Sequence, residues 1–248
     1  MGAVKKDPKD YIIFPLDLPD YDAAMPYVEK LASHVGLFKV GLELFISEGP
    51  PIIKAIQDTG PAEIFLDLKL HDIPATVQKA FSAASRHGVR FVTVHCDAGE
   101  EALRAAAKAG QGKTQILAVT VLTSLDTGAL KNLGYEKNYT EDISRLVLLR
   151  AKMAKRAGCH GMVCSGRELA KIRGALGRDV VLVAPGIRPS WSIVDADDQK
   201  RIVTPENAIK AGADYLVIGR PIRNAPDPAD AAKKVAEEIE KAITHAQK

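Results

Sequence analysis

Charged residues at alternate positions of an apolar segment are the strongest chemical signal in this sequence. The segment IFLDLKLHD, residues 64–72, places Asp67 and Lys69 between leucines. Because alternate side chains of a β-strand share a face, Asp67 and Lys69 point to one side of the strand and the leucines to the other. Burying an unpaired carboxylate or ammonium is costly. The pair is therefore either a structural ion pair or part of an array of charges that performs chemistry.

Two further charges occupy similar positions. Lys39 alternates with Phe38 and Val40 in an apolar run, and Asp17 ends the run that begins at residue 12. Taken alone, Asp17 is more typical of a turn or a helix cap. Taken with Lys39 and the pair at 67 and 69, it predicts one polar cluster across three neighbouring strands.

Asp72 has two interpretations. It closely precedes Pro74, which favours the first turn of a helix, so Asp72 suits a capping or dipole-stabilising position. Thr76, four residues later, is expected on the same side of that turn. The residues alone do not decide between capping and a role in a site.

Two segments are typical of an anion site. They are APGIRP, residues 184–189, and VIGRPI, residues 217–222, each at the end of an apolar run. Gly219 permits close backbone approach, and Arg188 and Arg220 suit charge-assisted contacts with a phosphate. A lone arginine after a strand is equally typical of an ordinary surface, so the prediction depends on both segments together.

Apolar runs alternate with amphipathic runs along the chain, and helix-ending glycines separate several of them: Gly60, Gly88, Gly110, Gly158 and Gly212. Helices are expected at 75–87, 100–109 and 141–157, and long loops at 124–140 and 188–203. This alternation predicts a single-domain α/β protein, residues 1–248, with the (β/α)8 or TIM-barrel fold. An open doubly wound sheet is the alternative, but no glycine-rich turn follows Asp17. The expected strands are 12–17, 37–44, 63–70, 90–96, 115–123, 161–165, 180–187 and 215–221.

Composition narrows the function classes. A net charge of +3 and 5% aromatic residues give no sign of a nucleic-acid surface, and no apolar stretch is long enough to span a membrane. Cys96, Cys159 and Cys164 form no CxxC pair, which favours reduced thiols and a cytoplasmic protein. His71 and His95 are more typical of packing or solvent-facing histidines than of metal ligands. With no HExxH or phosphate-loop motif, we expect neither a metal nor a cofactor.

The segment FLDLKLHDIPAT, residues 65–76, resembles the signature of the orotidine 5′-phosphate decarboxylase family, DxKxxD followed by IPxT. Related barrels that act on sugar phosphates carry a similar DxKxxD core. HDIPxT and PGIRP make the resemblance specific, and it extends over nearly the whole chain through LD at 16–17, KVG at 39–41, VTVLTS at 119–124, PGIRP at 185–189 and GRPI at 219–222.

The resemblance implies decarboxylation of orotidine 5′-monophosphate to uridine 5′-monophosphate, the last step of de novo pyrimidine synthesis, without a cofactor. It implies an alternating charge network in which Lys69 protonates the carbon that loses carbon dioxide. The other network members are Lys39, Asp67 and Asp72.

The same resemblance implies the binding residues. Asp17 and Lys39 contact the ribose, and Thr123 and Ser124 lie against the pyrimidine. The phosphate is held by Arg188, Gln199, Gly219 and Arg220. Asp72 and Thr76 reach into the partner subunit of a homodimer. One departure is the segment RPSWSIVDADDQ, residues 188–199, which is longer than the family form and leaves the exact partner of Gln199 open.

Two rival hypotheses remain. A magnesium-dependent decarboxylase or aldolase acting on a sugar phosphate needs an added carboxylate ligand, for which Glu43, in strand phase with Lys39, is the one candidate. A non-catalytic sensor of a phosphorylated ligand would have no need for a buried proton donor such as Lys69.

Overall fold

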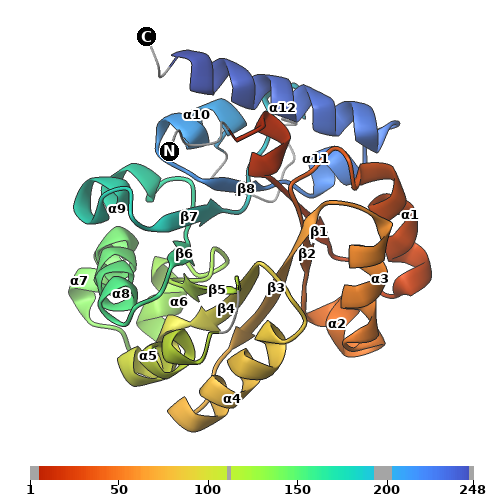
Figure 1. Cartoon of the computed structure of the whole chain (residues 1–248). Helices are drawn as coiled ribbons and strands as arrows, with labels where there is room; N and C mark the ends of the chain where they lie inside the picture. The colour runs from red at the N-terminus through yellow and green to blue at the C-terminus, as the bar shows by residue number, and fades with distance from the viewer. Residues whose placement is uncertain (1–5, 111–112, 193–202, 246–248) are drawn as a thin grey trace, which may run out of the picture.

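Eight parallel strands follow one another round a closed barrel, and β8 returns to pair with β1 (Figure 1). This computed structural model describes residues 6–110, 113–192 and 203–245. The closed sheet confirms the predicted (β/α)8 barrel and excludes the open doubly wound sheet. The strands are β1 (Ile12–Leu16), β2 (Leu37–Val40), β3 (Glu63–Leu70), β4 (Phe91–His95), β5 (Gln115–Val119), β6 (Gly161–Val163), β7 (Val181–Ala184) and β8 (Tyr215–Val217).

Helices surround the strands on the outside of the barrel, as Figure 1 shows. The helices predicted at 75–87, 100–109 and 141–157 correspond to α4, α5 and α8. The α-helices are α1 (Tyr21–Leu31), α2 (Leu42–Glu48), α3 (Pro51–Thr59), α4 (Pro74–Ser85), α5 (Gly99–Ala109), α6 (Thr127–Asn132), α7 (Lys137–Glu141), α8 (Ile143–Arg156), α9 (Leu169–Leu176), α10 (Pro205–Lys210), α11 (Arg220–Arg223) and α12 (Pro228–His245). Short 3-10 helices are η1 (Pro8–Tyr11), η2 (Cys96–Ala98) and η3 (Ser190–Ser192).

Strand alternation divides the apolar side chains between two cores. The outer core lies between the strands and the helices and includes Phe14, Phe38 and Leu66. The inner core fills the barrel with Ile13, Leu37, Phe65, Phe91, Leu117, Val183 and Val217. Residues two positions further along a strand share its inward face, so those at the carboxyl ends that alternate with these side chains also face the barrel axis.

Several strands end earlier than predicted. The strand expected at 37–44 stops at Val40, because Gly41 is the N-cap of helix α2, which begins at Leu42. Glu43 therefore lies on an exposed helical surface, out of strand phase with Lys39. The strand expected at 215–221 stops at Val217, since Pro221 suits the first turn of α11. The strands expected at 115–123 and 180–187 also end early, at Val119 and Ala184.

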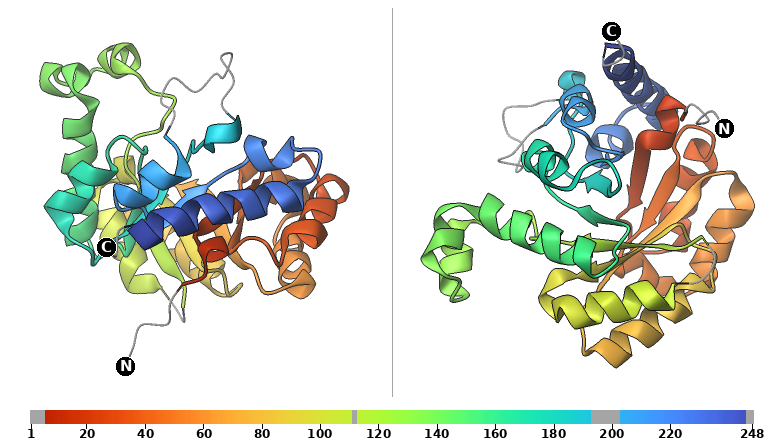
Figure 2. Two further views of the ribbon diagram at one scale, coloured as in Figure 1. Left: turned by 90° about the horizontal axis from the view of Figure 1, so that it is seen from above. Right: turned by 60° about the vertical axis from the view of Figure 1, so that its left-hand side comes forward.

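The segment 124–140 contains most of two short helices, α6 and α7, which makes the prediction of a long loop there wrong. Asp126 accepts a hydrogen bond from the backbone of Ala129 and caps α6, and Leu130 of α6 is fully buried. Figure 2 (left) shows α6 and α7 projecting from one end of the barrel, with η1 toward the other. The predicted loop at 188–203 contains η3, and its residues 193–202 lie outside the described part of the chain.

Within the described ranges, no helix combines the length and the apolar character needed to cross a membrane.

Candidate active site

A lysine and an aspartate of β3 form the centre of the site. The ammonium nitrogen of Lys69 lies 2.8 Å from Oδ2 of Asp67. Leu66, Leu68 and Leu70 pack into the outer core, so the inward orientation predicted for Asp67 and Lys69 is confirmed. Only 11% of the Asp67 side chain is exposed, against 34% for Lys69, so the ammonium is the more accessible of the two groups.

Strands β1 and β2 extend this pair into a row of alternating charges. Lys39 Nζ lies 3.7 Å from Asp67 Oδ2 and donates a hydrogen bond of 2.8 Å to Asp17 Oδ1. We call the row Asp17–Lys39–Asp67–Lys69 the charged array. Each buried charge in it has an opposite charge beside it, which offsets the cost of removing it from water.

The position of Asp17 is itself supported by a neighbouring helix. Arg223 of α11 donates a hydrogen bond of 3.0 Å to the backbone oxygen of Asp17. This contact ties the end of β1 to the segment that follows β8. Sequence reasoning did not single out Arg223, and its place one helical turn after Arg220 is the signal that was available.

A cavity of about 170 Å³ opens beside the charged array. Lys39, Asp67 and Lys69 line one part of it, and Thr123 also faces it. The remaining wall is mostly apolar and comes from the strands β3, β5, β6 and β8 and from residues that directly follow β5, β6 and β7: Phe65, Val119, Val121, Leu122, Val163, Cys164, Pro185 and Val217. A small apolar cavity with a few convergent charges is the usual form of a small-molecule site. Ser124, the neighbour of Thr123, is exposed and does not line this cavity.

The backbone at Lys69 is unusual. Its φ angle is 49°, the only positive φ of a non-glycine residue among the described residues. A lysine in this conformation costs roughly 1–2 kcal/mol relative to ordinary backbone geometry. Strained residues persist where surrounding contacts hold them, and they concentrate at functional sites.

The predicted anion-binding residues follow β7 and β8, which are neighbours in the barrel. Arg188 is buried, with 4% exposure, and its backbone bonds to Val203. Gly219 precedes α11, where a Cβ atom would lie 2.9 Å from Pro15 Cγ, so any larger residue would crowd β1. Arg220 begins α11. Gln199 lies outside the described residues.

Asp72 and Thr76 are not joined to the charged array of their own chain. Both side chains are exposed, and Asp72 Oδ1 accepts a hydrogen bond from the backbone of the adjacent Ile73. Helix α4 begins at Pro74 with no side-chain capping bond, so Asp72 does not cap it. The structure therefore brings together three of the four predicted network residues, Lys39, Asp67 and Lys69.

A second polar network, which the sequence did not reveal, lies at the ends of β4 and β5. Asp97 forms an ion pair with Arg150 of α8 and accepts a hydrogen bond of 3.0 Å from the Tyr135 hydroxyl. Arg150 also donates to Tyr135, at 2.7 Å, and to the backbone oxygen of Thr120, at 2.5 Å. The network joins the segment between α6 and α7 to the barrel.

Histidine and arginine partners determine the charge state of this network. Burial works to raise the pKa of Asp97, but its contact with His95, at 2.9 Å, and the Arg150 guanidinium together lower the pKa. His95 is nearly buried and stacks on His71 with ring centres 5.6 Å apart. The rings of both histidines thus pack against each other, which agrees with the interpretation of His71 and His95 as packing histidines.

Two hollows of about 570 Å³ lie on the outer surface, one between η1 and α12 and one between α4 and α5. Neither has paired charges converging on an apolar wall. Among the described residues, no group of three His, Cys, Asp or Glu side chains is placed to hold a metal ion.

Comparisons with known proteins agree on one family. The sequence profile of the orotidine 5′-phosphate decarboxylase / HUMPS family matches residues 10–235. The chain belongs to this family. An orotidine 5′-phosphate decarboxylase of Desulfosudis oleivorans is 49% identical over 237 residues, covering 95% of each chain. One of Anaeromyxobacter sp. (strain K) is 45% identical, covering 92% of this chain and 98% of the relative.

A solved structure supports the same assignment. The crystal structure of orotidine 5′-phosphate decarboxylase from Lactobacillus acidophilus matches with a TM-score of 0.80 and 34% sequence identity. It covers 92% of this chain and 98% of that one. The family resemblance seen in the segment at 65–76 is therefore confirmed over nearly the whole chain.

Proposed function

We propose that this chain decarboxylates orotidine 5′-monophosphate to uridine 5′-monophosphate and carbon dioxide, the last step of de novo pyrimidine synthesis. The family and its relatives carry the name of this activity. The observation that supports it in this chain is the charged array, which presents the Lys69 ammonium at a mostly apolar cavity.

Loss of carbon dioxide breaks a carbon–carbon bond and leaves its electron pair on a ring carbon that cannot delocalise it well. A fixed ammonium at that carbon stabilises the developing negative charge electrostatically. Lys69 then transfers a proton to the carbon, which forms the new carbon–hydrogen bond. The neutral amine takes a proton from water before the next turnover. No cofactor enters this scheme.

Asp67 has a positioning role in this scheme. Its Oδ2 atom contacts Lys69 at 2.8 Å and Lys39 at 3.7 Å, so one carboxylate oxygen orients two ammonium groups. Asp17 and Lys39, at the ends of β1 and β2, bind the ribose. Thr123 and Ser124, beyond β5, lie against the pyrimidine.

The phosphate binds beyond β7 and β8 in this proposal. Arg188, Gly219 and Arg220 all lie at the carboxyl ends of these neighbouring strands, where barrels commonly bind phosphate. Gln199 completes the set. Binding energy from the phosphate assists closure of the segments at the barrel mouth and removes water from the array.

The active unit is a homodimer in this proposal, with Asp72 and Thr76 entering the partner's site. Both residues are exposed and lack contacts with the charged array of their own chain. Ile73, which lies next to Asp72 in the sequence, is an apolar side chain with 67% exposure, and Ile46 on α2 is another, with 77% exposure. Such residues suit a protein interface better than a free surface.

Mixing two inactive variants tests the shared site. Lys69→Ala and Asp72→Ala homodimers are each expected to be inactive. After subunit exchange, a hybrid dimer has one site with both substitutions and one intact site. Random exchange restores about a quarter of wild-type activity if sites are shared across a two-fold interface. No recovery despite proven exchange contradicts the placement of Asp72.

The decisive test of the activity is an ultraviolet absorbance assay. Purified protein, treated with EDTA, is incubated with orotidine monophosphate. Decay to the uridine monophosphate spectrum supports both the reaction and its independence of a metal. No change, with the protein folded, would favour a magnesium-dependent barrel acting on a sugar phosphate. The single-domain organisation and the cytoplasmic location stay predictions.

A further inference from the structure

The pairing between β3 and β4 is interrupted beside the charged array. Phe65 and Leu66 pair with Phe91 and Val92, but the next pair is Leu70 with Val94. Three residues of β3, 67–69, therefore stand opposite Thr93 alone. Such a bulge redirects side chains and leaves backbone groups without their usual partners.

Thr93 supplies the missing backbone partner. The backbone N–H of Lys69 donates to Thr93 Oγ1 at 2.8 Å. This bond lies at the residue whose φ angle is 49°, so the strained conformation of Lys69 is held directly by a side chain of the neighbouring strand. Without it, the N–H would lose its bonding partner at a partly buried position.

The same hydroxyl also orients the carboxylate. Thr93 Oγ1 donates to Asp67 Oδ1 at 2.9 Å, while Oδ2 faces the ammonium groups of Lys69 and Lys39. The two oxygens of Asp67 thus have separate partners, and the bond from Thr93 to Oδ1 leaves Oδ2 facing the two ammonium groups. A hydroxyl has one hydrogen to donate and lone pairs to accept, so it can make both bonds at once.

Thr93 itself does not reach the cavity. Its side chain is fully buried, and it is not among the residues that line the space beside Lys69. It therefore acts on the chemistry only through Lys69 and Asp67.

We propose that Thr93 is a positioning residue, whose hydroxyl fixes both the backbone of Lys69 and the orientation of the Asp67 carboxylate. This inference rests on the proposed role of Lys69 as the proton donor. A misplacement of about 1 Å at a reacting group can reduce a rate by about 100-fold. The effect of Thr93 is therefore expected in kcat more than in KM, because the phosphate and ribose contacts are left in place.

Two substitutions separate the hydroxyl from the shape of the side chain. Thr93→Val keeps the volume and the branch but removes both hydrogen bonds. Thr93→Ser keeps the hydroxyl and removes a methyl group. We expect Thr93→Val to lower kcat by about 10- to 100-fold with a much smaller change in KM, and Thr93→Ser to stay within about 5-fold of wild type.

A matched control removes another buried hydroxyl. Thr114 is also buried, and its hydroxyl donates to the Val89 backbone oxygen at 2.7 Å, ahead of β5. Thr114→Val should lower thermal stability by an amount similar to Thr93→Val while leaving kcat unchanged. Equal losses of kcat in the two variants would mean that a general structural effect is responsible, and would overturn the proposal.

A crystal structure of Thr93→Val distinguishes failure of this proposal from failure of the proposed function. If Thr93 positions the pair, then in Thr93→Val the backbone of Lys69 should leave the positive-φ conformation, or the Lys69 ammonium should move away from Asp67. An unchanged Lys69 and Asp67 would overturn it, whatever the activity. The role of Lys69 is tested separately by Lys69→Ala. Retained activity in that variant would contradict Lys69 as the proton donor, but it would leave the positioning of Lys69 and Asp67 by Thr93 untouched.

Discussion

Lys69 Nζ and Asp67 Oδ2 lie 2.8 Å apart, although the two residues belong to one strand and are separated by a single leucine. Alternate residues of a strand point the same way, but such close contact requires their side chains to lean toward each other. The bulge in β3 and the positive φ of Lys69 provide that geometry. The ammonium is thereby fixed on one side by a carboxylate and remains open to the cavity on the other.

Replacing the lysine of this pair is the most direct test of the mechanism. Lys69→Ala removes the proton donor and the positive charge beside the reacting carbon, while the barrel core is untouched. We expect kcat to fall by about 100-fold or more, with the circular dichroism spectrum unchanged. Retention of more than a small fraction of the activity would contradict the role of Lys69.

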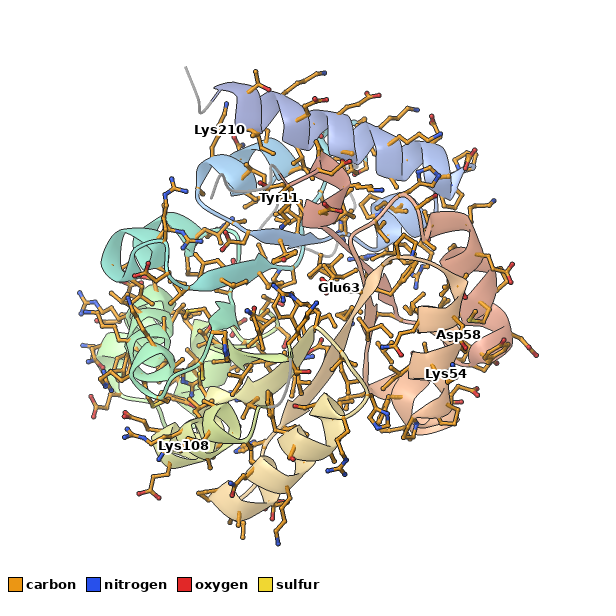
Figure 3. All side chains as sticks on the ribbon, in the orientation of Figure 1. Tyr11, Lys54, Asp58, Glu63, Lys108 and Lys210 are labelled. Atoms are coloured by element: carbon orange, nitrogen blue, oxygen red, sulfur yellow. The ribbon has the colours of Figure 1, made fainter. Side chains whose placement is uncertain are left out.

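A surface lysine provides the control for this substitution. Lys54 pairs with Asp58 on the outer face of α3, away from the barrel interior (Figure 3). Lys54→Ala also removes a lysine from an ion pair, but an exposed one that contributes little to stability. Its kcat should equal that of the wild type.

Arg220 tests the position of the phosphate site. Arg220→Ala removes a cation at the end of β8 and should weaken ligands through their phosphate. We expect the inhibition constants of both uridine monophosphate and inorganic phosphate to rise by about 10-fold or more. The measurement is competitive inhibition of the decarboxylation reaction at constant ionic strength.

The control for Arg220→Ala is an arginine at the opposite end of the barrel. Arg178 is exposed and precedes β7 rather than following it. Arg178→Ala should leave both inhibition constants unchanged. If the affinities of Arg220→Ala also stay unchanged, the strand-eight phosphate site is misplaced.

Most of the barrel could be predicted from the sequence because short apolar runs, typical of buried strands, alternate with amphipathic runs, typical of helices, along the chain. The strand ends could not. Glu43 continues the alternation of β2 in the sequence, but a few alternating residues fit a strand and a helix equally, and α2 begins at Leu42. The helices within 124–140 were not predicted, because Asp126, which caps α6, is also an ordinary turn residue, and α7 has no side-chain cap.

The charged array was predictable because a charged residue that alternates with apolar residues in a buried strand is easily recognised in the sequence. Thr93 was not, since a threonine in a strand is common and its importance depends on the bulge in β3. Arg150 was equally inconspicuous, because an arginine in a long amphipathic helix is ordinary. Its partner Asp97 is 53 positions away, and only the folded chain brings the two together.

The network around Asp97 should restrain the segment that contains α6 and α7. Tyr135→Phe removes the hydroxyl that bonds both Asp97 and Arg150. We expect faster amide hydrogen exchange across 127–141 and a fall in kcat/KM of a few fold, because this segment adjoins Thr123 at the cavity. The measurement is hydrogen exchange followed by mass spectrometry.

Tyr139→Phe is the matched control for Tyr135→Phe. Tyr139 lies on α7 in the same segment and packs against the outer core. It takes no part in the network around Asp97, so its variant should exchange like the wild type. Equal acceleration in both variants would show that the network does not restrain the segment.

The three cysteines predict how the protein responds to alkaline pH. Burial raises the pKa of the Cys96 thiol to about 12 and also raises those of Cys159 and Cys164. All three are therefore protonated in the folded protein near pH 8, and we expect none to react with a thiol reagent until the chain unfolds.

The same shifts make stability fall as the pH rises. In the unfolded chain the thiols lose their protons near pH 8.5, whereas in the folded chain Cys96 keeps its proton to about pH 12 and the pKa values of Cys159 and Cys164 are also raised by burial. Between these values the unfolded state binds fewer protons, so each thiol lowers the free energy of unfolding by up to about 1.4 kcal/mol per pH unit. Urea unfolding at pH 7.5 and pH 9.5 measures the effect, and Cys164→Ala should reduce the difference between the two. A difference that is the same in this variant as in the wild type would show that Cys164 does not contribute.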